Sequence, residues 1–221
     1  MVNDIKIIKD IYSEGRCYED MLAYEHRFLK TWEAEVSTFF PPNSTILNIG
    51  CGKGREAFCL NEKGFCVTGI DISETVIKTA KSIAVLNNLD IDFMVSDGFN
   101  LAFPDESFDV IIIWAQTFGL IYGERNQQHI LSECKRVLKK NGVFSFSVHD
   151  REVLQVICPD YLTEGYFIPY PDDNPELRYT VFIADELVEI ATKAEFHEID
   201  CKKGFTGKES DGSILHCLCR K

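Results

Sequence analysis

The chain has 221 residues, 45% of them hydrophobic, and a formal net charge of −12. The length fits one domain, and the hydrophobic content is too high for a disordered chain. Because this excess of acidic groups repels phosphate backbones, a nucleic-acid partner is not expected. No apolar run approaches the roughly 20 residues of a membrane-spanning helix, and nothing resembles a secretion signal. We therefore expect a cytoplasmic protein without a membrane partner.

Residues 1–42 are expected to form a helical cap. A short helix is predicted over residues 3–12, followed by a break at "SEGR". Apolar residues then recur with a helical period from Tyr18 to Phe40, and Pro41-Pro42 ends that helix.

After Pro42 the pattern changes to short apolar runs that alternate with helical stretches. Strands are expected at 45–50, 66–71, 91–96, 108–115 and 143–148, and helices at 54–63, 73–87 and 124–139. "KKNG" (139–142) is expected to be a turn that leads into the fifth strand. The alternation is typical of βαβ units, so residues 43–150 are predicted to form an α/β core with a parallel sheet covered on both faces.

Residues 151–182 interrupt this alternation, because they are rich in proline and aromatic residues and show no clear period. Residues 183–221 are predicted to return to regular structure, with a helix followed by two strands in a β-hairpin. The long irregular segment is the natural candidate for a lid, since function tends to reside in such loops.

Nine cysteines are scattered along the chain without a CxxC pair. In the absence of a secretion signal, we expect all nine to be reduced and mostly buried. Cys217 and Cys219 would lie on one face of a strand, too close along the chain for an easy disulfide. The five histidines are not grouped with the cysteines at ligand spacing, so no metal site is expected.

The stretch "TILNIGCGKG" places Gly50, Gly52 and Gly54 where the first strand should turn into a helix. Glycine permits a positive φ and a close approach of a ligand, and the helix start presents free N–H groups. Asp71 ends the second strand, where a carboxylate can accept both hydroxyls of a ribose. Its alternative role, as the cap of the next helix, is weakened because Ser73 can serve as that cap. The pattern predicts a nucleotide or cofactor site.

The glycine spacing fits a dinucleotide site poorly. Counted from Gly50, the sixth position of GxGxxG is Arg55 rather than glycine. Counted from Gly52, it is Ala57, which some dinucleotide sites allow. A nicotinamide-dependent oxidoreductase therefore stays an alternative, although no second catalytic domain is recognisable.

Four segments in sequence order resemble the class I S-adenosylmethionine-dependent methyltransferases. They are "LNIGCGKG", "VTGIDIS", "SDGFNLAFPDESFDVIIIWAQTF" and "HILSECKRVLKKNGVFSFSV". The resemblance covers most of residues 44–150 and, more loosely, residues 184–220. It implies a doubly wound, mostly parallel sheet of seven strands in the order 3-2-1-4-5-7-6. The N-terminal helices and the insertion after the fifth strand would cap this sheet.

The resemblance also implies S-adenosyl-L-methionine as the cofactor and a role for each matching residue. Asp71 would bind the ribose, and Asp97 would accept a hydrogen bond from the adenine amino group. Asn48 stands where the family often has an acidic residue, so it lacks the charge that attracts an ammonium. The full set of implied cofactor-binding residues is Asn48, Gly50, Cys51, Gly52, Gly54, Asp71, Ile72, Asp97, Gly98, Trp114 and Ala115.

Methyl transfer from a sulfonium requires mainly orientation and exclusion of water, and a general base only if the acceptor is protonated. His149, at the end of the fifth strand, is the candidate base, with a hydrogen-bonded structural histidine as the alternative. Asp150, Tyr122 and Tyr170 are weaker candidates. Aromatics such as Trp114 and Phe118 offer either cation–π contact or simple packing.

The acceptor is expected to be a small molecule selected by residues 1–40 and 151–182. Acidic residues in the second segment weakly favour an amine acceptor, and a solvated acidic loop is the alternative. A protein that binds the cofactor without catalysis is a further hypothesis. The sequence leaves the oligomeric state open.

Overall fold

The structure is a computed structural model that describes residues 2–15, 18–20, 28–204 and 214–221. A seven-stranded sheet with the order β3-β2-β1-β4-β5-β10-β9 forms its centre. Five strands are parallel, namely β1 (Thr45–Ile49), β2 (Cys66–Asp71), β3 (Asp92–Val95), β4 (Phe108–Ile113) and β5 (Leu138–His149). The last two, β9 (His197–Gly204) and β10 (Ile214–Arg220), are antiparallel to their neighbours. The predicted fold class and strand order are confirmed.

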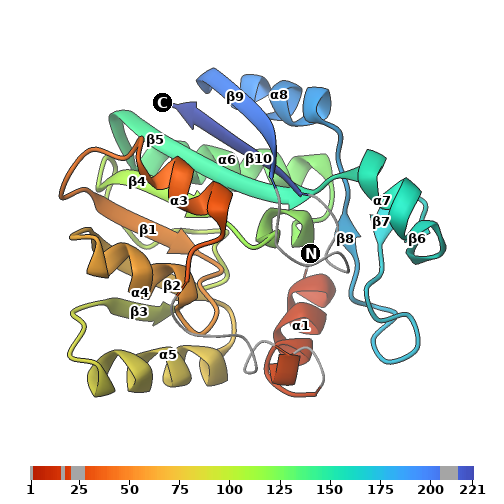
Figure 1. The fold of residues 1–221 in the computed structure, drawn as a ribbon, viewed down its shortest axis with the longest axis horizontal. Coiled ribbons are helices and arrows are strands. Elements are labelled where there is room, and N and C mark those ends of the chain that lie inside the picture. Colours follow the sequence, from red (N-terminus) through yellow and green to blue (C-terminus); the bar gives the residue numbers. More distant parts are fainter. Residues whose placement is uncertain (1, 16–17, 21–27, 205–213) are drawn as a thin grey trace.

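Helices cover both faces of this sheet (Figure 1). One face carries α3 (Thr31–Ser37), α4 (Arg55–Glu62) and α5 (Glu74–Leu86), and the other carries α6 (Glu124–Val137) and α8 (Ala184–Lys193). Strand β4 shows why both faces are buried: Ile111 and Ile113 belong to the core under α6, while Val110 and Ile112 belong to the core under α4 and α5. The side-chain period of two thus places alternate residues of one apolar run in two separate cores.

The remaining elements lie beyond the carboxyl ends of the parallel strands. They are α1 (Val2–Ile11), η1 (Thr117–Leu120), α7 (Arg151–Ile157), η2 (Pro159–Tyr161) and a small sheet of β6 (Leu162–Thr163), β7 (Tyr166–Phe167) and β8 (Tyr179–Thr180). Helix α1 and the segment from α7 to β8 lie on the same side of the molecule (Figure 1). No helix among the described residues combines the length and the apolar character needed to cross a bilayer.

The prediction of one continuous helix over residues 18–40 is wrong, because the helix is broken near its middle. Residues 28–30 are not helical, α3 starts only at Thr31, and residues 21–27 lie outside the described part of the chain. Tertiary contacts fix the break: the carbonyl of Phe28 accepts from the Arg55 guanidinium at 2.9 Å, and the N–H of Lys30 donates to the Glu33 carboxylate at 2.8 Å. Contacts of this kind override helical periodicity.

The "KKNG" segment is part of β5 rather than a turn before it. Phe108 pairs with Leu138, but Val110 already pairs with Val143, so the extra residues of β5 bulge out of the ladder. Asn141 adopts a positive φ of 60° at this irregularity. Asparagine tolerates that conformation, so a turn-like sequence can also serve inside a strand.

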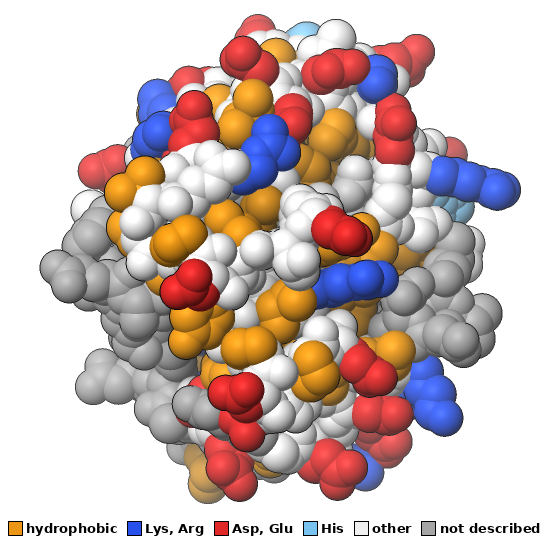
Figure 2. Space-filling model, turned by 90° about the vertical axis from the view of Figure 1, so that its right-hand side faces the viewer, with side chains coloured by type: hydrophobic (Ala, Val, Ile, Leu, Met, Phe, Trp, Pro, Cys, Tyr) orange, Lys and Arg blue, Asp and Glu red, His pale blue; other side chains and the backbone are white. Residues whose placement is uncertain are grey.

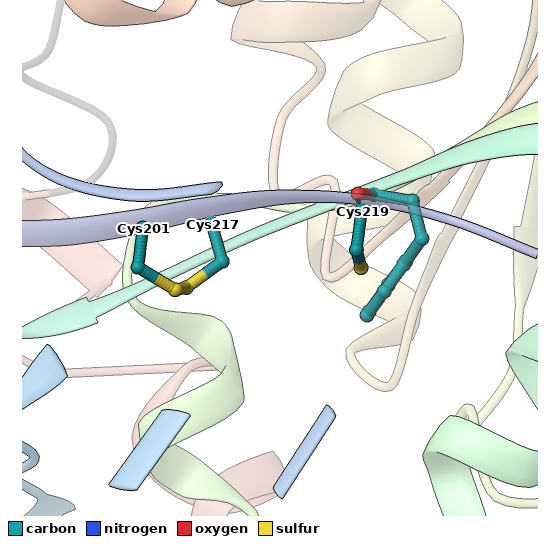
Figure 3. Close-up of a disulfide and its surroundings, with 4 residues drawn as sticks. Cys201, Cys217 and Cys219 are labelled. Carbon is teal, nitrogen blue, oxygen red and sulfur yellow. Dashed lines mark hydrogen bonds between the residues drawn. A yellow bond between two sulfur atoms is a disulfide. The ribbon is translucent and has the colours of Figure 1, made fainter. Parts of the chain in front are cut away.

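The expectation that every cysteine is reduced is wrong for one pair. Cys201 in β9 and Cys217 in β10 form a disulfide, with their Cα atoms 4.2 Å apart (Figure 3). The two residues face each other in the antiparallel register, although 16 residues separate them along the chain. Six described cysteines are free, including Cys219, which lies beside this pair on β10. Sequence reasoning weighed only neighbours along one strand, whereas the hairpin brings a partner from the next strand.

Candidate active site

The turn between β1 and α4 can be built only with glycines. Gly50, Gly52 and Gly54 have φ values of 72°, 54° and 97°, a region that other residues rarely adopt. A Cβ atom on Gly50 would lie 2.4 Å from Cγ2 of Thr117, and one on Gly54 would lie 2.7 Å from the Phe58 ring. The turn therefore combines a left-handed backbone with close packing on the residues behind it.

Asp71 is held in place by this turn. Its Oδ2 accepts a hydrogen bond from the N–H of Gly52 at 3.0 Å, and its Oδ1 accepts one from the N–H of Ser73 at 2.9 Å. Burial raises the pKa of Asp71, while these hydrogen bonds act in the opposite direction. Each carboxylate oxygen keeps a second lone pair, so the group can still accept hydroxyl hydrogens from a ligand.

A cleft of about 1090 Å³ opens beside these two features. Its floor is the row of carboxyl strand ends, which is where open α/β sheets bind ligands. Nine of the predicted site residues line it, namely Gly50, Cys51, Gly52, Asp71, Ile72, Asp97, Gly98, Ala115 and His149. Asn48, Gly54 and Trp114 are not among its lining residues. The structure therefore brings most of the predicted residues together at one cleft.

The residues behind the cleft have structural contacts. Asn48 lies within β1 at 1% exposure, and its Nδ2 has no partner among the described residues. The Trp114 side chain is buried, and its Nε1 donates to Oγ of Ser145 at 2.9 Å. Phe118 is fully buried against Phe146. Of the two roles considered for Trp114 and Phe118, the structure supports packing.

Asp97 follows β3, the strand that pairs with β2, so it lies at the same edge of the sheet as Asp71. Its side chain is exposed, and its Oδ1 accepts a hydrogen bond from the N–H of Phe99 at 2.9 Å. The backbone turns at Gly98, with a φ of 76°, and a Cβ atom there would lie 3.3 Å from Ile49. The carboxylate is therefore ordered by its own turn and is open to the cleft.

His149 faces the cleft from the end of β5. Its side chain is 7% exposed, and its ring meets the rings of Phe167 and Tyr179 edge-on, at centroid distances of 4.8 and 5.0 Å. Burial lowers the pKa of His149 to about 3, and the positive charge of Lys30 acts in the same direction. The imidazole is therefore uncharged near neutral pH, and its Nδ1 has no partner among the described residues.

The weaker candidate bases are occupied by other contacts. Asp150 caps α7 by accepting from the N–H of Glu152 at 3.0 Å. The hydroxyl of Tyr122 donates to the carbonyl of Arg178, and that of Tyr170 donates to Asp20. These groups have structural roles, so His149 is the one candidate base among the described residues that lines the cleft with a ring nitrogen that forms no hydrogen bond.

Two segments that are far apart in sequence close the cleft. The hydroxyls of Tyr12 and Tyr179 are hydrogen-bonded to each other across 167 residues, and Tyr170 donates to Asp20 at 2.8 Å. Figure 2 faces this end of the molecule, where hydrophobic side chains are spread across the middle of the surface and charged ones are more frequent toward its edge. The N-terminal residues and the insertion thus form one roof. We call the part of the cleft beneath it the cap half, lined by Ile5, Ile8, Tyr12, Gln116, Leu120, His149, Tyr161, Phe167, Tyr170 and Tyr179.

Arg55, noted above for the poor dinucleotide spacing, anchors this roof to the core. Its guanidinium makes two bonds of 2.7 Å to the two oxygens of Glu33 and a further contact to Glu56. All three residues are buried. The same guanidinium lies over the Phe28 ring, 5.0 Å from its centroid. The residue that follows the glycine turn therefore fixes the N-terminal segment beside it.

Sequence reasoning missed Gln116 altogether. It lies three residues after the end of β4, and Ala115 and Gln116 both adopt positive φ values, 51° and 60°. The N–H of Gln116 donates to Oγ of Ser147 at 3.2 Å, and its side chain lines the cleft. No sequence signal marks this position, because neither alanine nor glutamine is typical of a left-handed backbone.

The described residues contain no group of three or more histidine, cysteine or acidic side chains arranged to hold a metal ion.

Known proteins are similar to this chain both in sequence and in architecture. A family profile described as "Methyltransferase domain" matches residues 46–142. The uncharacterized protein MJ1252 of Methanocaldococcus jannaschii is 30% identical over 193 residues, which cover 86% of this chain and 70% of that protein. The chain belongs to the class I S-adenosylmethionine-dependent methyltransferases. The family's cofactor is S-adenosylmethionine.

Two further comparisons show how far this likeness extends. A SAM-dependent methyltransferase from Methanosarcina mazei has the same fold, with a TM-score of 0.71, 24% identity, and coverage of 87% of this chain and 99% of that one. The 2-methyl-6-phytyl-1,4-hydroquinone methyltransferase of Synechocystis is 36% identical over 104 residues, or 47% of this chain and 31% of that enzyme. The chain also matches two relatives from Bacillus subtilis and Geobacillus, and the matched segments span 57% and 46% of the lengths of those relatives.

Proposed function

We propose that this methyltransferase transfers the methyl group of S-adenosylmethionine to a small molecule held in the cap half of the cleft. One observation carries the proposal: a single cleft runs from the glycine turn and Asp71 to His149 and the aromatic side chains of the roof. A donor and an acceptor bound at its two ends would therefore share one cleft, as a direct transfer between them requires.

The residues at the glycine turn fit the cofactor. The absence of side chains at Gly50 and Gly52 leaves backbone atoms facing the cleft, and Asp71 keeps lone pairs for two ribose hydroxyls. Asp97, which also lines the cleft, can accept from an adenine amino group. We assign Gly50, Cys51 and Gly52 to the methionine part, and Ile72 and Gly98 to the adenine. The backbone of Ala115 is assigned to the amino group.

The chain's own residues would orient the partners and exclude water. When bound, the sulfonium supplies an activated methyl group that an acceptor lone pair can displace in line. The paired tyrosines and the apolar side chains of α1 close the cleft from above, so water is displaced from the space between the ligands. The Synechocystis relative is named for a hydroquinone substrate, which supports a small-molecule acceptor here.

The alternatives have less support. Arg55 occupies the sixth position of the glycine pattern and is committed to Glu33 and Glu56, so it does not leave the space that a third glycine would give a dinucleotide. A protein that binds the cofactor without catalysis would not require an enclosed second half of the cleft.

Calorimetry with S-adenosylhomocysteine and NADH, followed by a screen of acceptors for S-adenosylhomocysteine release, tests the proposal. We expect binding of S-adenosylhomocysteine, no binding of NADH, and turnover with at least one small molecule. Binding of S-adenosylhomocysteine without turnover of any acceptor class would favour the non-catalytic alternative. Tighter binding of NADH would overturn the cofactor assignment. Asp97→Asn tests the adenine assignment separately: it should narrow the preference for S-adenosylhomocysteine over its deaminated analogue.

A further inference from the structure

Two polar atoms in the cleft are buried without a partner. Among the described residues that line the cleft, only Gln116 and His149 have a buried side-chain nitrogen that forms no hydrogen bond, at Nε2 and Nδ1 respectively. Leaving such a group unpaired costs free energy comparable to a lost hydrogen bond. A ligand that supplies the missing partners would remove this cost.

The backbone places both groups at the same edge of the sheet. Gln116 follows β4 and His149 ends β5, and these strands are parallel neighbours. The N–H of Gln116 donates to Ser147, two residues before His149. Ala115 and Gln116 are two successive left-handed residues, a conformation that is unfavourable for non-glycine side chains, and such strain tends to persist at functional sites.

The chemistry of the two atoms restricts what can bind between them. The amide Nε2 of Gln116 can only donate, so its partner must carry a lone pair. A neutral imidazole carries one N–H and one lone pair, so His149 can pair with a group that donates, accepts or does both. Phe167 and Tyr179 flank the His149 ring edge-on, which leaves flat apolar walls beside it. A hydroxyl group on an aromatic ring satisfies all of these conditions.

Charged ligands fit less well. An ammonium group has no lone pair for Gln116. A carboxylate would need an uncompensated cation, and three cations line the cleft: Lys30, Lys53 and Arg55. Arg55 pairs with the buried carboxylates of Glu33 and Glu56, Glu56 also interacts with Lys30, and Lys53 is not without a partner either. Asp20, an acidic side chain that lines the cleft and that an ammonium could approach, already accepts a hydrogen bond from Tyr170.

Building on the proposed methyltransferase function, we propose that the cap half binds an uncharged aromatic hydroxyl compound, with Gln116 donating to its hydroxyl oxygen and His149 hydrogen-bonded to the same group. His149 is then a binding residue that orients the acceptor. Its buried, weakly basic ring suits that role better than removal of a proton.

The test uses four probes that share one ring system: 2-naphthol, 2-naphthoate, 2-naphthylmethylamine and 2-methylnaphthalene. Binding of each to the full chain saturated with S-adenosylhomocysteine is measured by calorimetry, so that no turnover is needed. We expect 2-naphthol to bind about tenfold or more tightly than 2-methylnaphthalene, since two neutral hydrogen bonds distinguish the two ligands. The charged probes should bind more weakly than 2-naphthol.

Two variants assign the effect to residues. Gln116→Leu keeps the size of the side chain but removes the donor, and it should lower the 2-naphthol preference by about fivefold. Gln116→Glu replaces the donor with an acceptor, and it should shift the preference toward the amine. The matched control is Gln155→Leu on the exposed side of α7, which should change neither preference. Thermal unfolding of each variant confirms that it is folded.

The possible outcomes separate this inference from the proposed function. If S-adenosylhomocysteine binds but 2-naphthoate or the amine is the preferred probe, the acceptor class is wrong and the methyltransferase function stands. The same conclusion follows if Gln116→Glu leaves the order of the probes unchanged. If S-adenosylhomocysteine itself does not bind, the proposed function fails and this inference fails with it.

Discussion

The two ends of the cleft differ in how far apart their residues lie in the sequence. One end holds the glycine turn and Asp71, and we call it the cofactor end because we assign it to the cofactor; the cap half is the other end, or cap end. At the cofactor end, the bond between Gly52 and Asp71 spans 19 residues, and the turn, the carboxylate and the following helix cap belong to one βαβ unit. At the cap end, the bond between Tyr12 and Tyr179 spans 167 residues, and His149 comes from a third segment. Local chain geometry therefore builds the cofactor end, whereas the cap end depends on how remote segments pack together.

This difference has a physical consequence. The cofactor end is supported by backbone hydrogen bonds and by the sheet, which are the most stable parts of such folds. The cap end depends on a few side-chain contacts and on the buried Arg55 cluster that ties the N-terminal segment to the core. Five substitutions test this difference between the two ends, and they follow in decreasing order of effect, with that of His149 counted per pH unit.

The largest effect is expected where the two ends are joined. Arg55→Met leaves the carboxylates of Glu33 and Glu56 buried without their cation, so we expect a loss of about 3–5 kcal/mol in unfolding free energy. Arg220→Met, at an exposed pair with Glu198, is the control and should cost about 1 kcal/mol or less. Urea unfolding measures both. Equal effects would show that the buried cluster does not anchor the N-terminal segment.

The next largest effect concerns the cofactor end. Asp71→Ala removes the carboxylate assigned to the ribose, so S-adenosylhomocysteine should bind roughly 2–4 kcal/mol more weakly. Asp92→Ala, on the exposed edge strand β3, should leave the affinity unchanged. Calorimetry decides this, and an unaltered affinity in Asp71→Ala would refute the ribose assignment.

The disulfide lies on strands that do not contribute to the cleft lining, so its loss should affect stability alone. Cys201→Ser opens a loop of 16 residues, and we expect the unfolding free energy without reductant to fall by about 3 kcal/mol. With reductant, the variant and the unsubstituted chain should have similar stabilities. The affinity for S-adenosylhomocysteine should not change. A weaker affinity would show that the hairpin of β9 and β10 is energetically coupled to the cofactor end.

His149 makes the cap end sensitive to acid. Its pKa is lowered to about 3 in the folded chain, whereas an unfolded histidine titrates near 6.5. Between these values the unfolded chain binds one more proton, so acidification favours unfolding by up to about 1.4 kcal/mol per pH unit. His149→Gln should flatten the stability profile between about pH 6.5 and 3. An unchanged slope would mean that the pKa of His149 in the folded chain is close to its unfolded value, so that the ring is protonated in both states over this pH range.

The smallest effect is expected at the roof. Tyr12→Phe removes one hydrogen bond to Tyr179, worth about 1 kcal/mol, and should speed amide exchange in β7 and β8. Tyr161→Phe, whose hydroxyl has no hydrogen bond within the described residues, is the control. Exchange in β1 and β4 should stay slow in both variants. If β7 and β8 are already as protected as β4 and do not respond, the insertion is a fixed part of the fold rather than a lid.

Sequence reasoning was most successful where structure is local. The alternation of apolar runs predicted the strands of the core, because a side-chain period of two and a helical period are properties of short segments. The glycine spacing located the turn, since only glycine adopts three left-handed conformations so close together without strain. The strand order came from the family resemblance, and the structure confirmed it.

The features that the sequence did not reveal depend on contacts between distant residues. The break at residues 28–30 follows from a bond to Arg55, and the disulfide follows from the register of β9 on β10. The neutral state of His149 follows from burial by the insertion, and the position of Gln116 follows from a strained turn. The core fold and the glycine turn beside Asp71 could be predicted from the sequence. The cap end could not, because its groups become neighbours, and lose their water, only when remote segments pack together.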